Sequence, residues 1–197
     1  MTGKRLRLAT ILAGLLLSGL TLIAWTQQWV SVTVIDGPTL DVGGDVAAPA
    51  LSTLSLAGLA LVGALTVAGP VFRLILGILE AFLGALIVYS GVTALNDPIA
   101  AAAPSITEVT GRSGIESIRT LVSAASATAW PVVTIVLGTL LVLLAVAVLV
   151  SSRRWPVAGR KYQAVRLEST DGETSNAEAS NVESWDALSG GNDPTQR

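Results

Sequence analysis

The chain has 197 residues, of which 51% are hydrophobic and 13% are charged, and its formal net charge at pH 7 is −2. A soluble domain usually carries about 25% charged residues, so this composition argues against an ordinary soluble protein. The sequence contains no cysteine and no histidine, which excludes disulfides, thiolate chemistry and histidine ligands or bases. We therefore expect no enzyme, no cofactor and no metal site.

Four apolar stretches dominate the chain, and they cover residues 8–25, 51–72, 74–95 and 132–150. The bilayer hydrocarbon is roughly 30 Å thick and a helix rises about 1.5 Å per residue, so each stretch can cross once. The prediction is an all-α membrane protein, a four-transmembrane-helix bundle over residues 1–155. A small extracytoplasmic cap of a hairpin and a helix is expected on it, followed by a disordered cytoplasmic tail over residues 156–197.

The first stretch follows a basic start formed by Lys4, Arg5 and Arg7. A cleaved signal peptide begins in the same way. However, this stretch is longer than a usual signal sequence and no small-residue cleavage site follows it. We expect an uncleaved first helix.

The distribution of basic residues predicts the orientation. Nine of the 12 Lys and Arg residues lie before the first span or after the fourth, a tenth, Arg73, lies between the second and third, and only Arg112 and Arg119 lie between the third and fourth. Lys and Arg gather on the cytoplasmic side, so we predict a multi-pass plasma-membrane protein with both termini cytoplasmic. Tryptophans at the predicted span ends agree with this layout as interface anchors: Trp25, Trp29 and Trp130 outside, and Trp155 inside.

The first outer segment predicts a β-hairpin. Residues 29–35 are β-branched and alternating, Asp36-Gly37-Pro38 is a turn signal, and residues 39–42 can return as a second strand. A merely extended loop is the alternative.

The second outer segment predicts two helices. Ser105 and Glu108 have the spacing of a capping box, which predicts a helix that begins at Ser105 and is cut short by Gly111. Apolar residues then recur at helical spacing, at Ile115, Ile118, Val122 and Ala125, which predicts an amphipathic surface helix. A structural cover is favoured over ligand binding for this helix.

Glu80 is the one acidic residue inside a predicted span. It lies on a helix in which small residues recur every seven positions, at Gly77, Gly84 and Gly91. Such a stripe lets a neighbouring helix approach closely, so we predict a packed seam with Glu80 near it. A buried carboxyl is a functional candidate by default. The alternative, which we favour, is a structural Glu80 that is protonated or bonded to a hydroxyl such as Thr66 or Ser18.

The last residues change in character. A basic segment follows the fourth span, and we interpret it as a headgroup anchor and not as a nucleic-acid site. Beyond it the chain is rich in Ser, Thr, Asn, Gly and acids, which predicts disorder. Trp185 and Leu188 lie one helical turn apart in this tail and form the predicted docking element for a partner.

Several of these features occur in the same order in a known family. The matching features are the four spans, Trp25 with Trp29, the segment 73–84, Trp130-Pro131, the segment 154–162 and the tail motif 185–195. By these features the chain resembles the actinobacterial tryptophan-associated transmembrane proteins, also called Trp biosynthesis-associated membrane proteins. This chain has Gly190 and Asn192 where the family often has Arg or Asp. The family is named for genes that lie beside tryptophan synthesis genes, and the resemblance implies no reaction.

Three functions are compatible with the sequence. The first is a non-enzymatic scaffold in the lipid bilayer, whose tail docks a cytosolic partner such as a tryptophan-pathway protein. The second is a transporter or permeation helper for tryptophan or indole, for which a homo-oligomer in the form of a dimer would supply eight spans. The third is an envelope structural protein that acts through its outer hairpin. We favour the scaffold, because the spans lack the paired broken helices of carriers.

Overall fold

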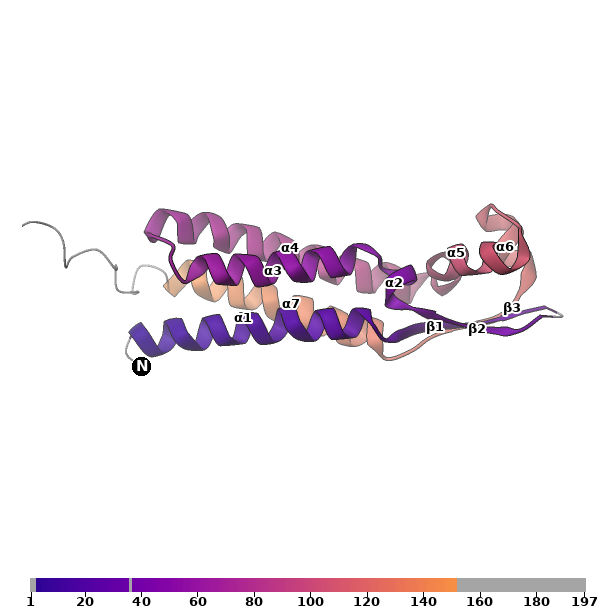
Figure 1. Cartoon of the computed structure of the whole chain (residues 1–197), viewed down its shortest axis with the longest axis horizontal. Helices are drawn as coiled ribbons and strands as arrows, with labels where there is room; N and C mark the ends of the chain where they lie inside the picture. The colour runs from indigo at the N-terminus through magenta and orange to yellow at the C-terminus, as the bar shows by residue number, and fades with distance from the viewer. Residues whose placement is uncertain (1–2, 36, 152–197) are drawn as a thin grey trace, which may run out of the picture. The chain divides into compact units, whose positions relative to one another are not determined.

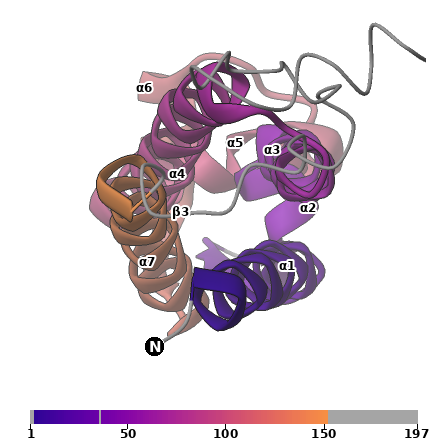
Figure 2. The ribbon, with the colours of Figure 1, turned by 90° about the vertical axis from the view of Figure 1, so that its left-hand side faces the viewer.

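The computed structural model of the chain describes residues 3–35 and 37–151, and most of these residues are helical. Four long apolar helices lie side by side in it: α1 (Gly3–Trp25), α3 (Ala50–Leu65), α4 (Pro70–Asn96) and α7 (Trp130–Ser151) (Figure 1). Viewed along their axes, they form a ring in which α1 contacts α3, α3 contacts α4, α4 contacts α7, and α7 closes back onto α1 (Figure 2).

Three of these helices, α1, α4 and α7, are long and apolar enough to cross a membrane, whereas α3 has 16 residues. The predicted second span, residues 51–72, is therefore too long. α3 ends at Leu65, and Pro70, which lies inside the predicted second span, opens the next helix. Proline suits the first position of a helix because the N–H that it lacks has no partner there.

On α1, the buried side chains are small or polar and the exposed ones are large and apolar. The inward face of α1 consists of Thr10, Gly14, Ser18, Thr21 and Ala24, all buried. Its outward face exposes leucines instead, at Leu8, Leu12 and Leu16 among others, each more than half exposed. A bundle in water has the opposite distribution, so the apolar surface fits lipid, and small residues make the helix contacts.

The second part of the fold is a cap at one end of the bundle. It holds a three-stranded antiparallel sheet in the order β2-β1-β3, built from β1 (Gln28–Val34), β2 (Thr39–Gly43) and β3 (Val122–Ala127). The predicted hairpin is present as β1 and β2, in which Ser31 pairs with Asp41. The short helices α2 (Gly44–Ala47), α5 (Pro98–Thr110) and α6 (Ile115–Leu121) complete the cap.

The predicted amphipathic helix was wrong beyond residue 121. α6 ends at Leu121, and Val122–Ala127 continue as β3, which pairs with the free edge of β1. The backbone groups of that edge need partners, and this demand outweighs the helical spacing of the apolar side chains. The helix before Gly111 also differs from the prediction, because α5 begins at Pro98 and is capped by Asp97 and not by Ser105.

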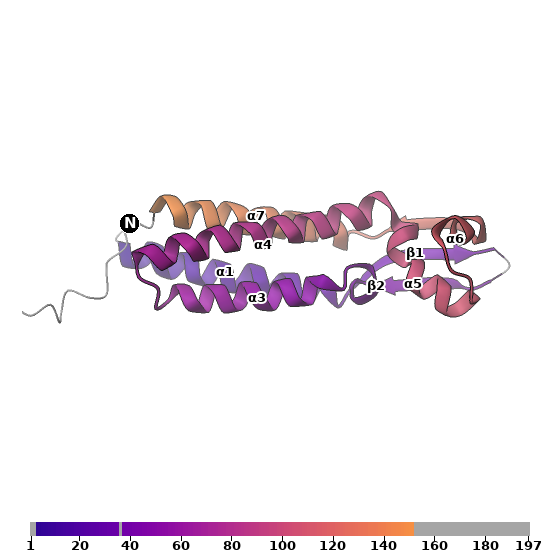
Figure 3. The ribbon, with the colours of Figure 1, turned by 90° about the horizontal axis from the view of Figure 1, so that it is seen from above.

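One face of the sheet carries the core of the cap. Val30 and Val32 of β1 and Val42 of β2 are buried and belong to one cluster with Ile106 of α5 and Ile118 of α6. Figure 3 shows both helices against the same face of the sheet. The opposite face bears polar side chains, where the Ser31 hydroxyl donates to Asp41 Oδ1 at 3.0 Å.

The sheet joins the bundle through short connections. Two residues separate α1 from β1, and two separate β3 from α7. Trp29 begins the buried part of β1, and its indole N–H donates to the Ala24 carbonyl of α1 at 2.7 Å. On the other side, the Thr128 hydroxyl donates to the Gln28 carbonyl at 2.7 Å. The antiparallel pair β1–β3 thus continues the antiparallel pair α1–α7.

Candidate functional site

The strongest candidate site is the buried carboxyl of Glu80. This side chain belongs to the inward face of α4 and is only 2% exposed. Among the described residues, neither of its carboxyl oxygens has a hydrogen-bond partner. A buried polar group normally has such a partner, so an unbonded carboxyl in an apolar bundle needs an explanation.

Two other helices bring their own residues to the same point. Gly58 of α3 lies opposite Glu80, and a Cβ placed on Gly58 would be 3.8 Å from Glu80 Oε1 and 2.8 Å from the hydroxyl oxygen of Ser18. Ser18, on α1, is fully buried, and its hydroxyl also has no hydrogen-bond partner among the described residues. The lack of a side chain at Gly58 thus lets Ser18 and Glu80 approach the α3 backbone together.

The predicted hydroxyl partners of Glu80 differ in position. Ser18 lies beside the carboxyl but makes no hydrogen bond with it. Thr66 lies outside α3, and its hydroxyl donates to the Gly63 carbonyl at 2.6 Å. Of the two, only Ser18 is therefore placed to interact with Glu80.

The predicted glycine stripe contacts α7, while Glu80 contacts α3. A Cβ on Gly84 would be 2.8 Å from Val142 Cγ2 and 3.0 Å from the Gly138 carbonyl oxygen. A Cβ on Gly91 would likewise meet a side chain and backbone atoms of α7, whereas one on Gly77 would meet side chains of α7. Gly138 of α7, which lies outside the predicted stripe, completes the seam from the other side, since a Cβ placed on it would be 2.9 Å from the Gly84 carbonyl oxygen. α4 therefore packs on α7 through backbone and presents its acid to the bundle centre.

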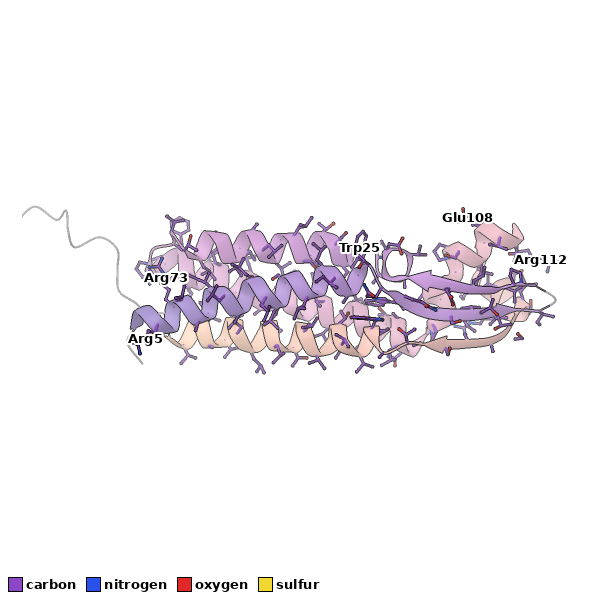
Figure 4. All side chains as sticks on the ribbon, turned by 60° about the horizontal axis from the view of Figure 1, so that its bottom comes forward. Arg5, Trp25, Arg73, Glu108 and Arg112 are labelled. Carbon is purple, nitrogen blue, oxygen red and sulfur yellow. The ribbon has the colours of Figure 1, made fainter. Side chains whose placement is uncertain are left out.

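Basic residues lie at the end of the bundle away from the cap. Figure 4 shows Arg5 and Arg73 at this end, and Glu108 and Arg112 in the cap. The Arg7 guanidinium donates to the Thr66 carbonyl in the link between α3 and α4. The Arg73 side chain, on the first turn of α4, is only 2% exposed.

The predicted aromatic anchors lie where the cap meets the bundle. Trp29 is fully buried in the cap core, and Trp25 and Trp130 pack against that core as partly buried side chains. Trp155, Trp185 and Leu188 lie outside the described residues.

The cap contains an ion pair and a cleft that the sequence did not indicate. Asp97 accepts from the backbone N–H of Ala100 at 3.1 Å and forms an ion pair with Arg119 at 2.5 Å. Beside it, a cleft of about 420 Å³ is lined mainly by alanines, together with Thr93, Asn96 and Asp97. Within residues 3–35 and 37–151, no three acidic side chains gather in a way that could hold a metal ion.

The comparison with known protein families agrees with the resemblance found in the sequence. The tryptophan-associated transmembrane protein family matches residues 11–195, which is nearly the whole chain. No curated protein and no solved structure matches significantly. The chain thus belongs to the family of tryptophan-associated transmembrane proteins and is an integral membrane protein.

Proposed function

We propose that this member of the tryptophan-associated transmembrane family is a non-enzymatic membrane scaffold. All four apolar helices would cross the bilayer, the cap would lie on the extracytoplasmic side, and the tail would dock a cytosolic partner. The observation that carries the proposal is the separation of the two ends. The folded cap lies at one end of the bundle, while α1 begins and α7 ends at the other, beside Arg5 and Arg73 (Figures 1 and 4).

The orientation follows from charge. The end with Arg5, Arg7 and Arg73 has no acid among its described residues, because Glu80 lies inside the bundle and the other described acids lie in the cap. Basic residues remain on the cytoplasmic side, so both chain ends are assigned to the cytoplasm of the cell.

The crossing of α3 needs an argument, because its 16 residues span only about 24 Å. α3 packs between α1 and α4, and its outward Leu56 is 56% exposed. α3 consists of apolar and small residues with a few hydroxyl side chains, and it contains no charged residue. A short helix held by longer ones is accommodated by local thinning of the bilayer.

The tight contact between α4 and α7 favours a static scaffold over a carrier. A carrier needs parts that move against each other around a central site. Here the glycines of α4 and Gly138 of α7 bring the two backbones together, and any opening of this seam would lose those contacts. Docking is therefore assigned to the tail.

The test is affinity capture of the full chain from mild detergent, compared with a chain that lacks residues 183–197. We expect a soluble partner to co-purify with the full chain only. Trp185→Ala should weaken capture by about 2 kcal/mol, as at an interface hot spot, while Asn181→Ala serves as the matched control in the same tail. Unchanged capture after the deletion would contradict docking through the tail.

A second candidate function is a permeation helper for tryptophan or indole, and the central position of Glu80 favours it. Its test is uptake of labelled tryptophan and indole into vesicles that contain the purified chain. Uptake that is abolished by Glu80→Gln, with intact folding, would support transport and count against the scaffold.

A further inference from the structure

The unpartnered groups at the centre of the bundle point to a site that neither scaffold nor tail requires. Glu80 Oε1 and the Ser18 hydroxyl both lie within 4 Å of the place that a Cβ on Gly58 would take. They come from α4 and α1, helices that face each other across the ring, and they meet against α3 (Figure 2). Both side chains are at least nine-tenths buried, and both lack a hydrogen-bond partner among the described residues.

The charges around Glu80 show which form of the carboxyl the site can hold. α3 and α7 carry no ionisable side chain, and those of α1 are confined to its first residues, Lys4, Arg5 and Arg7. On α4 itself, Arg73 is seven residues away, about two helical turns, and Tyr89 is 66% exposed. An ionised carboxylate at this position would thus be buried without a hydrogen-bond donor from the described residues, which disfavours the charged form.

We propose that Glu80, Ser18 and Gly58 form a proton-binding site in which the neutral carboxylic acid and the Ser18 hydroxyl share one buried water molecule. The protonated carboxyl supplies one donor and the hydroxyl another, and a single water can accept from and donate to both. A buried water usually bridges polar groups that would otherwise be unsatisfied, and it needs two to four of them.

The position of Gly58 determines the geometry of this site. Any side chain at residue 58 would come within 2.8 Å of the Ser18 oxygen and would separate the serine from the carboxyl. Ser55, one turn away on the same helix, is a useful contrast. It is also fully buried, but its hydroxyl donates to the Leu51 carbonyl of its own helix at 2.7 Å, so it is already satisfied.

Infrared spectroscopy of the full chain in lipid membranes tests the proposal. At neutral pH, the difference spectrum between the parent and Glu80→Gln should contain the carbonyl stretch of a protonated carboxylic acid. Ser18→Ala should move that band to higher frequency, because a hydrogen bond to the site is lost. Ser55→Ala is the matched control and should leave the band in place.

A second measurement needs no substitution at Glu80. Carbon-13 labelling of glutamate in the parent should shift the same band, because Glu80 is the buried glutamate of the described residues, whereas Glu108 and Glu116 are exposed. Carboxylate bands in place of the acid band at neutral pH would overturn the proton-binding site. An acid band that Ser18→Ala leaves unchanged would overturn the shared water.

Discussion

Replacement of Gly84 by alanine tests the close approach of α4 and α7. Two of the three atoms nearest to the new Cβ are backbone atoms, the Gly138 carbonyl oxygen and the Val142 nitrogen, each at 3.0 Å. Backbone atoms cannot rotate away, so the helices must separate by a few tenths of an ångström along the seam. Overpacking of this kind costs about 1–3 kcal/mol. The gain in helix propensity offsets about 0.5–1 kcal/mol of that cost, so we expect a net loss of roughly 1–2 kcal/mol.

The assay is reversible unfolding of the purified chain in mixed detergent micelles, followed by tryptophan fluorescence. Gly19→Ala and Gly63→Ala are the matched controls, because nothing lies within 4 Å of a Cβ at either position. The controls should be as stable as the parent or slightly more stable. If Gly84→Ala unfolds at the same denaturant concentration as these controls, the backbones of α4 and α7 do not approach closely enough at Gly84 to exclude a Cβ.

Three further predictions concern the cap and the topology. Asp97→Ala should lower the stability of the cap by about 1–2 kcal/mol, because α5 loses its N-terminal capping residue. Arg119→Ala should cost less than about 1 kcal/mol, because the ion pair is exposed. Hydrogen exchange of the backbone amides in the cap measures both effects. Trp29→Ala should cost about 3–5 kcal/mol, and a cap whose protease resistance is unchanged would refute its core role. In this cysteine-free chain, an impermeant thiol reagent should label Ser113→Cys but not Ser175→Cys in intact cells; labelling of both would reverse the assigned topology.

The sequence predicted the apolar helices well but placed one boundary wrongly. Long apolar runs are a local property, and α1, α4 and α7 follow from them directly. The boundary between α3 and α4 does not, because apolar residues continue across the link from Thr66 to Gly69. Hydropathy cannot separate two helices there. The position of Pro70 contains the signal, since proline is favoured at the start of a helix.

The third strand could not be predicted from its own residues. β3 consists mainly of Ala and Ser, which have little preference for strands, and it forms because β1 offers a free edge from the other outer segment. The ion pair between Asp97 and Arg119 likewise joins two charged residues that have no local relation in the sequence.

The candidate site was predicted in part. Glu80 was recognisable because it is the single acid in an apolar stretch, and the heptad spacing of glycines indicated a close helix contact. The spacing did not reveal that the glycines and the acid contact different helices. That distinction depends on Gly58 and Gly138, which lie on other helices. Nothing in the sequence relates them to Glu80 and Gly84, and only the folded bundle places them opposite these residues.

The short connections between sheet and helices have a mechanical consequence. β1 and β3 are hydrogen-bonded to each other and run into α1 and α7 after two residues each, so a force applied to the cap passes directly into those two helices. At the opposite end, the described residues contain no such strand pair between α1 and α7, whereas α3 and α4 are joined there by a four-residue link. A pull on the cap would thus act on α1 and α7 together. The close packing of α7 on α4 would oppose a displacement of this helix pair.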